Sequence, residues 1–293
     1  MSTQRESMLS GLPIWSKLSF REKKQVKRIG MYLLLAIPLI QILFPLYWMI
    51  ATSLQPVQTV TSTPVQYVPT QFTLDAYLNV FFQTSIPKYY FNSIFISAGV
   101  VTLTTVAATF GGYGLTRLNI SYKETFAKSI LFGYMFPPIL LSIPMYIFWR
   151  EFGILNTYLG LILAETAVAL PFALWLMWQF FQTVPMELEE SAKMAGASRF
   201  RAFYEVALPV AKPGMIAISV FAYQVSWNAF TIPKVLMQEE ARWPLTVGLY
   251  TLTQSHFIFW NQMMAASTLI ILPSFVFVYY LQRHILQGFK ISA

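Results

Sequence analysis

Few side chains in this chain of 293 residues could do acid, base or nucleophilic chemistry. It has no cysteine, two histidines (His256 and His284) and 12 acidic residues. The lack of cysteine excludes disulfides, thiol nucleophiles and thiolate metal ligands. Two separated histidines form no ligand cluster, so we expect no metal site. No apolar segment carries paired acids or a nucleophile with its base, which argues against a membrane-embedded enzyme.

The charged residues gather in one stretch. Four of the 12 acidic residues lie between Met186 and Pro209, in MELEESAKMAGASRFRAFYEVALP, together with three basic residues. Pro185 can begin a helix there, and the glutamates after it lie near the positive end of the helix dipole. Gly196 can end that helix, and Ser198 can cap a second short helix that ends near Pro209. We therefore expect a helical hairpin that rests on the chain's own spans or the lipid interface, or docks on a partner.

A second group of polar side chains lies inside apolar segments. Polar groups in a membrane span are expected to face the interior of the helix bundle. Glu165 could line a pore or pair with another group, or it could reach the headgroup region near a helix end. The largest cluster follows it in the chain and comprises Tyr223, Gln224, Ser226, Trp227 and Asn228.

Hydrophobicity sets the elements that position these residues. Apolar residues make up 56% of the chain and charged residues 11%, with a mean hydropathy of +0.54, which does not fit a water-soluble surface. The apolar runs are continuous rather than alternating, so we predict an all-α integral membrane protein and not a barrel. Prolines predict kinked or broken helices, above all in MFPPILLSIP. Six segments reach the ~20 residues needed to cross a bilayer: 31–53, 89–113, 129–149, 158–182, 213–235 and 258–281.

Basic residues indicate the orientation. Seven of the 20 fall in the first 30 positions, just before an apolar run, so the net charge of +8 favours a cytoplasmic membrane flank over nucleic-acid binding. That run is too long for a signal-peptide core and has no cleavage site behind it, so we expect it to remain as an anchor. With the N-terminus inside, sixteen basic residues are cytoplasmic and four external. Both termini are therefore predicted to be cytoplasmic.

The predicted organisation has one membrane domain between two short tails. FTLDAYLNVF predicts a short external helix capped by Thr73. The parts are a basic cytoplasmic tail (1–30), a six-helix transmembrane domain (31–281) with an external loop (54–88) and a charged cytoplasmic loop (183–212), and a C-terminal cytoplasmic tail (282–293).

The charged loop resembles the EAA loop of ATP-binding-cassette importer permeases. That family's pattern is Glu-Ala-Ala, a few residues, Gly, and about a dozen positions later Leu-Pro. Two positions depart from it, because Ser191 stands where alanine is usual and Ala195 where aspartate is. The matching residues are Glu190, Ser191, Ala192, Gly196, Leu208 and Pro209.

The resemblance covers about residues 30–289 and is strongest to the second permease subunit of maltose-type sugar importers. The segments QVSWNAFTIPKVLM, PLTVGLYTL and MMAASTLIILPSFVFVYYLQRHILQGF carry it. After Gly288 the chain reads FKISA, unlike the small-residue and lysine ending of the family.

This resemblance implies a type I importer in a prokaryotic cell membrane. Two permease subunits would form the pore, two ATPase subunits would bind beneath it, and an extracellular or periplasmic sugar-binding protein would dock outside. The chain lacks GxxxxGK followed by Ser or Thr, so ATP and Mg²⁺ belong on the partner ATPases and no cofactor is expected here. The charged loop would be the coupling helix, with ATPase contacts at Glu187, Glu190, Ala192, Gly196, Ala197, Arg199 and Pro209.

A sugar substrate would use the polar cluster of the fifth span. Sugars are neutral and polyhydroxylated, so their sites combine aromatic faces with amide and hydroxyl groups. An ion-coupled secondary transporter is the alternative function, but it needs ion-binding acids or unwound segments near the midplane, and Glu165 alone supports it. The expected substrate pathway comprises Tyr223, Gln224, Ser226, Trp227 and Asn228, with Met135, Phe136 and Glu165 as further candidates.

Overall fold

The computed structural model describes residues 20–119, 121–253 and 258–290. Residues 1–19 and 291–293 of the predicted tails, and His256, lie outside the described residues. Within the described part the chain is helical, with no strand. The helices are α2 (Phe20–Ser53), α3 (Val57–Val60), α4 (Asp75–Gln83), α5 (Ile86–Arg117), α6 (Lys123–Tyr134), α7 (Pro138–Glu151), α8 (Tyr158–Gln182), α9 (Met186–Met194), α10 (Arg199–Ala202), the π-helical η2 (Phe203–Ala207), α11 (Leu208–Trp227), α12 (Thr231–Leu236), the 3₁₀-helical η3 (Glu240–Arg242), α13 (Leu245–Leu252) and α14 (Trp260–Lys290).

Five described helices are long and apolar enough to cross a membrane, and α6 with α7 adds a sixth if this bent pair counts as one span. The all-helical class is thus confirmed for the described residues, whereas the count of six stays a prediction. The fourth predicted span, 158–182, has the bounds of α8. The five spans are Arg28–Ser53, Ile86–Arg117, Tyr158–Gln182, Arg199–Trp227 and Trp260–Phe277.

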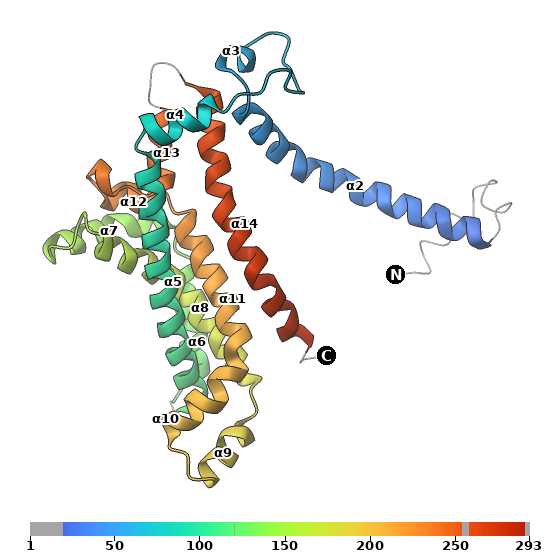
Figure 1. Ribbon diagram of the computed structural model, residues 1–293. Helices are drawn as coiled ribbons and strands as arrows, with labels where there is room; N and C mark the ends of the chain where they lie inside the picture. Colours follow the sequence, from blue (N-terminus) through green and yellow to red (C-terminus); the bar gives the residue numbers. More distant parts are fainter. Residues whose placement is uncertain (1–19, 120, 254–257, 291–293) are drawn as a thin grey trace.

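Helices α5, α8 and α11 pack together at the centre of the bundle (Figure 1). Gly112 lets α5 approach α8 closely, because a Cβ atom there would lie 2.8 Å from both the Cβ of Met177 and the backbone N of Trp178. Small residues permit such close approach between membrane helices. Ala108 and Phe181 belong to the buried cluster around this contact. The cavity described below lies beside α8 and the end of α11, and the charged hairpin lies between α8 and α11 in the chain.

The third predicted span, 129–149, is broken rather than straight. Helices α6 and α7 meet at an angle of 93°. The break comprises Met135, Phe136 and Pro137, and α7 begins at Pro138, so the predicted disruption in MFPPILLSIP is confirmed. A residue before proline is pushed out of the α-helical region, and Pro137 has an extended ψ of 134°. Proline then suits the first turn of the next helix, so α7 starts directly after the break.

The fifth predicted span, 213–235, was wrong at both ends. The helix starts at Arg199 and ends at Trp227, and the separate short helix α12 follows. The apolar run continues past the end of the helix at Trp227, so its length does not indicate where the helix ends. The break is made by Asn228, whose side-chain amide donates to the carbonyl of Gln224 (2.9 Å) and so satisfies one of the last helix carbonyls.

Pro209 does not end the second helix of the hairpin, contrary to the prediction. The chain runs from α10 through η2 into α11 as one continuous span. Pro209 lies in the first turn of α11, directly after the π-helical segment. A proline ring clashes with the carbonyl four residues earlier in an α-helix, and a π turn, which bonds five residues back, widens that position. The second hairpin helix is therefore the beginning of the fifth span.

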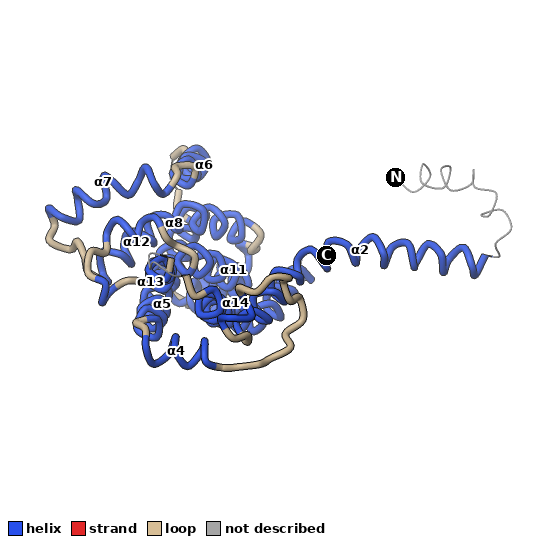
Figure 2. Tube along the Cα trace, turned by 90° about the horizontal axis from the view of Figure 1, so that it is seen from above, coloured by secondary structure: helices blue, strands red, loops and turns tan. Residues whose placement is uncertain are grey.

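Helix α2 projects away from the bundle (Figure 2), and at its C-terminal end Ala51, Thr52 and Ser53 are buried. None of its most apolar window is buried. The loop 54–88, which is predicted to be external, holds α3 and α4, and the predicted short helix is confirmed as α4. The N-cap of α4 is Leu74 rather than the predicted Thr73, whose hydroxyl accepts a hydrogen bond from the N–H of Asp75 (3.1 Å). The Ser53 hydroxyl and the Tyr77 hydroxyl, 2.7 Å apart, join the end of α2 to α4.

Candidate functional site

The charged loop forms the predicted helical hairpin at one end of the bundle. Helix α9 follows Pro185, and two hydrogen bonds of 3.0 Å end it: Gly196 N–H to the carbonyl of Lys193, and Ala197 N–H to the carbonyl of Ala192. This pair is a Schellman motif, which needs a residue with positive φ. Gly196 has a φ of +93°, where any side chain would strain the backbone. The predicted glycine stop is thereby confirmed.

The second half of the hairpin is fixed by a serine cap and an arginine. The Ser198 hydroxyl accepts from the N–H of Arg201 (3.2 Å), so the predicted N-cap is confirmed. The guanidinium of Arg199 donates to the carbonyl of Arg117 (3.3 Å), at the last residue of α5. A cation at the negative end of a helix dipole is favourable. Arg199 thus ties the hairpin to α5.

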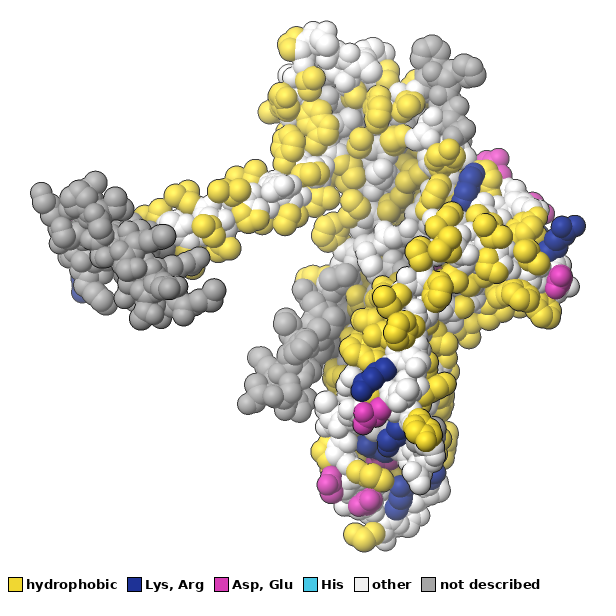
Figure 3. Space-filling view, turned by 180° about the vertical axis from the view of Figure 1, so that it is seen from behind, with side chains coloured by type: hydrophobic (Ala, Val, Ile, Leu, Met, Phe, Trp, Pro, Cys, Tyr) yellow, Lys and Arg dark blue, Asp and Glu magenta, His cyan; other side chains and the backbone are white. Residues whose placement is uncertain are grey.

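The hairpin presents a mixed surface, with charged side chains gathered at the lower end of the molecule (Figure 3). Apolar side chains lie among them: Met194 is 87% exposed and Phe200 68%. Exposed apolar groups beside charges suit a contact with another protein. Among the residues expected to meet the ATPase, Ala192 and Ala197 are half-buried and the others are exposed: Glu187, Glu190, Gly196, Arg199 and Pro209.

The two departures from the family pattern leave the hairpin's backbone intact. The Ser191 hydroxyl donates to the carbonyl of Glu187 (2.8 Å), within its own helix. Ala195 is the C-cap of α9, and its N–H donates to the carbonyl of Ser191 (3.1 Å). Neither residue places a charged group on the exposed surface.

Glu189 is a residue of the hairpin whose role the sequence did not reveal. Its side chain is 1% exposed, and Arg117, 7% exposed, donates through Nε to Oε1 at 2.7 Å. The Tyr113 hydroxyl donates to Oε2 at 2.7 Å, and Arg117 also donates to the carbonyl of Val184 at 2.8 Å. In the sequence, the only sign of this pairing was Arg117, which follows the second predicted span on the side of the membrane predicted for the hairpin. A separation of 72 residues hides this pairing.

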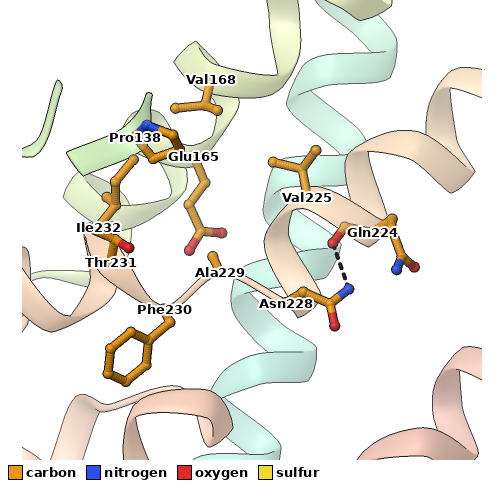
Figure 4. Close-up of a pocket in the computed structure, with 10 residues that line it drawn as sticks. All are labelled: Pro138, Glu165, Val168, Gln224, Val225, Asn228, Ala229, Phe230, Thr231 and Ile232. Atoms are coloured by element: carbon orange, nitrogen blue, oxygen red, sulfur yellow. Dashed lines mark hydrogen bonds between the residues drawn. The ribbon is translucent and has the colours of Figure 1, made fainter. Parts of the chain in front are cut away.

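A cavity of about 330 Å³ lies beside α8, where α11 ends and α12 begins. Among its lining residues are Glu165, Gln224, Asn228 and Thr231. Figure 4 shows the carboxylate of Glu165 pointing from α8 toward Ala229. The cavity therefore brings a carboxylate together with amide and hydroxyl groups, which is a set able to hydrogen-bond a polyhydroxylated molecule.

A short chain of hydrogen bonds holds Glu165 in place. The Ser226 hydroxyl donates to Glu165 Oε2, and the Ser97 hydroxyl of α5 donates to Ser226 (3.1 Å). Glu165 is 2% exposed and Ser226 6%. Buried polar groups need such partners. The chain links α5, α11 and α8 at the cavity.

The other expected pathway residues lie away from the cavity lining. Tyr223 stacks on Phe277 of α14 (ring centroids 4.3 Å apart). Trp227 donates through Nε1 to the carbonyl of Ile270 (3.1 Å), also in α14. Both are therefore on the stripe of α11 that packs against α14. Met135 and Phe136 lie at the break between α6 and α7, 73% and 57% exposed.

Comparison with known proteins gives one family match. A sequence profile of the family described as "Binding-protein-dependent transport system inner membrane component" matches residues 108–291. An inner membrane ABC transporter permease protein of Escherichia coli K12 is 31% identical over 268 residues, covering 91% of this chain and 96% of that protein. The matched range contains the hairpin and the cavity.

Two further relatives are named for sugar uptake. A diacetylchitobiose uptake system permease protein of Streptomyces coelicolor is 30% identical over 246 residues, covering 83% of this chain and 81% of that protein. A trehalose transport system permease protein of Mycobacterium tuberculosis is 30% identical over 253 residues, covering 86% and 92%.

A solved structure shares the fold. It is a chain of a bacterial ABC transporter involved in the import of the acidic polysaccharide alginate, with a TM-score of 0.76 and 22% sequence identity. The match covers 91% of this chain and 99% of that chain. At this identity the likeness establishes the fold alone.

Proposed function

The chain belongs to the family of inner membrane components of binding-protein-dependent transport systems, and from that membership we propose that it is a permease subunit of an ATP-driven sugar importer. It would form half of the translocation pore and hydrolyse nothing itself. The family match over residues 108–291 carries this proposal. It gives no support to an ion-coupled secondary transporter.

Sugar is the substrate class that the relatives favour. The permeases for diacetylchitobiose and trehalose align with more than four-fifths of this chain. The cavity adds chemical support, because Glu165, Gln224 and Asn228 can exchange hydrogen bonds with hydroxyl groups. Tyr223 and Trp227 would support α11 from behind, Ser226 would hold Glu165, and Met135 and Phe136 would line the path at the α6–α7 break.

The hairpin is the proposed docking site for an ATPase. Its exposed surface combines Glu187 and Glu190 with Met194 and Phe200. The tight turn at Gly196 would allow close approach by a partner cleft. Two ATPase subunits would hold ATP and Mg²⁺, since this sequence has no phosphate-binding loop. The basic residues would place this end, and both termini, in the cytoplasm.

A second permease and a sugar-binding protein would complete the importer. Helix α2 has an apolar surface that no part of the described chain covers, which suits lipid and a second permease subunit. Helices α3 and α4 lie at the opposite end from the hairpin (Figure 1), where a sugar-binding protein would dock. The family's dependence on a binding protein supports this partner.

Co-purification followed by ATPase assays tests the proposal. The chain is expressed with its neighbouring permease, ATPase and sugar-binding protein genes and isolated in detergent or nanodiscs. We expect one complex whose ATP hydrolysis rises when the binding protein is added with one sugar of a panel. Hydrolysis that ignores the binding protein and every sugar would overturn the proposal.

A further inference from the structure

The hairpin is joined to the bundle both through the chain and through side chains. The covalent connection to α11 is continuous, because α10 runs through η2 into α11. The side-chain connections to α5 are the hydrogen bond from Arg199 to the carbonyl of Arg117 and the contact between Glu189 of α9 and Arg117. Helices bend at π-helical segments, so the covalent connection through η2 is not necessarily stiffer than the side-chain contact.

The Arg117–Glu189 contact has the features of a rigid joint. Arg117 bonds two separate groups, the Glu189 carboxylate and the carbonyl of Val184 that precedes α9. Tyr113, one turn earlier on α5, bonds the second carboxylate oxygen. A planar guanidinium with several fixed donors sets direction as well as distance. Together these bonds fix α9 in orientation relative to α5.

Aromatic rings close the joint from water. The ring of Tyr113 lies 4.5 Å from that of Phe203 and 5.6 Å from that of Phe181, between centroids. By contrast, the ion pair Arg201–Glu205 (66% and 54% exposed) is open to solvent. Buried charge pairs of this kind cost much to break by removing one partner, whereas exposed pairs contribute little.

Resting on the proposed function, we infer that the buried Arg117–Glu189 pair makes α9 and α5 move as one body when an ATPase displaces the hairpin. Arg117, Glu189 and Tyr113 are positioning residues, since they lie beneath the exposed surface of α9. An ATPase can shift the pore between conformations only if it interacts differently with each of them. The Arg117–Glu189 pair would make the position of the hairpin depend on the position of α5, and so on the conformation of the pore.

The other end of this route is the cavity. Ser97 of α5 donates to Ser226, which bonds Glu165. Ser97 and Arg117 are 20 residues apart on one helix, or about 30 Å at ~1.5 Å per residue. Helix α5 therefore spans the distance from the hairpin to the hydrogen bonds that hold the cavity carboxylate.

A distance measurement tests the joint without any ATPase. The chain has no cysteine, so spin labels can be placed at Lys193→Cys on α9 and Thr102→Cys on α5, both exposed. We expect one narrow distance distribution, and a clearly broader one when Glu189→Gln is added. A distribution of equal width in both proteins would overturn the inference, whether or not ATPase docking is correct.

Coupling assays in the assembled importer test the consequence. Glu189→Gln is expected to raise the ATP hydrolysed per sugar transported by about fivefold or more, the lower end of typical coupling between sites. Arg117→Met with Glu189→Leu refills the space with apolar side chains, so we expect normal expression but the same poor coupling. Normal coupling in this double variant would show that the pair only fills space, and would overturn the inference.

A matched control uses an exposed cytoplasmic pair. Glu124 and Lys128 of α6 are 3.6 Å apart and 72% and 68% exposed. Glu124→Gln removes the same charge as Glu189→Gln and should leave both the distance distribution and the coupling ratio unchanged. A ratio that rises equally in the control would assign the effect to net charge and overturn the inference.

Discussion

Glu165 combines burial with a hydrogen-bonded position at a cavity. The Ser226 hydroxyl donates to Oε2 of Glu165, and the carboxylate of Glu165 points to the space beside Ala229 (Figure 4). The sequence identified Glu165 and Ser226 as separate candidates, because polar residues stand out in apolar runs. Their contact, across 61 positions, depends on how α8 and α11 pack and could not be predicted from spacing.

Replacing this carboxylate tests its proposed contact with sugar. Glu165→Ala removes a buried carboxyl group that can hydrogen-bond a sugar hydroxyl, and one such hydrogen bond contributes about 0.5–1.5 kcal/mol. We expect the apparent KM for uptake to rise roughly twofold to tenfold, with normal amounts of assembled complex. Thr166→Val is the matched control, since Thr166 is the next residue of α8 and its buried hydroxyl has no partner. An unchanged KM in Glu165→Ala would contradict the proposed contact.

At the hairpin, a single glycine gives the turn its shape. Gly196→Asp forces a side chain into a φ of +93°, which costs about 1–3 kcal/mol, and adds charge at the exposed tip. We expect the chain to reach the membrane while co-purification with the ATPase falls. Gly153→Asp is the matched control, because Gly153 also has positive φ (+69°) and lies outside the hairpin, beyond α7. Equal loss of ATPase in both variants, or in neither, would contradict the docking proposal.

Among the elements, the contact between α5 and α8 depends on a close backbone approach. Gly112→Ala would place a Cβ 2.8 Å from backbone and side-chain atoms of α8, so overpacking should destabilise the bundle by about 1–3 kcal/mol. Gly114→Ala meets its nearest atom at 3.6 Å and is the control. Thermal unfolding in detergent, followed by tryptophan fluorescence, should show a lower midpoint for Gly112→Ala alone. Equal midpoints would contradict this packing.

Sequence reasoning located most elements and the proline break between α6 and α7, but it did not locate the ends of the fifth span. The apolar runs predicted α5 and α8 well, because continuous hydrophobicity and helix length are local properties. Two errors lay in the fifth span, where Asn228 breaks an apolar run and a π segment carries Pro209 into a continuous helix. The hairpin's caps were correct because Gly196 and Ser198 act on their immediate neighbours.

The whole molecule has a charged end and an opposite end made of loops and short helices (Figures 1 and 3). The basic residues predict which end is cytoplasmic, whereas the fold alone does not show which end faces which side of the membrane. The sequence of one chain also does not identify its partner subunits. Their presence is inferred from the family and from the apolar surface of α2.

Cysteine labelling in intact cells tests the orientation. Because the native chain has no cysteine, Gln71→Cys in the loop predicted to be external and Lys193→Cys on α9 each give one reactive site. A membrane-impermeant maleimide should label Gln71→Cys in intact cells, and Lys193→Cys only after permeabilisation. The reverse pattern would contradict the predicted cytoplasmic termini and the hairpin's side.

The central claim is that this chain is the pore subunit of a sugar importer driven by ATP. The most direct measurement is sugar uptake by proteoliposomes that contain the assembled complex, with binding protein outside and ATP inside. We predict uptake that requires both and persists when ionophores collapse proton and sodium gradients. Uptake that continues without ATP and stops with the ionophores would contradict the account.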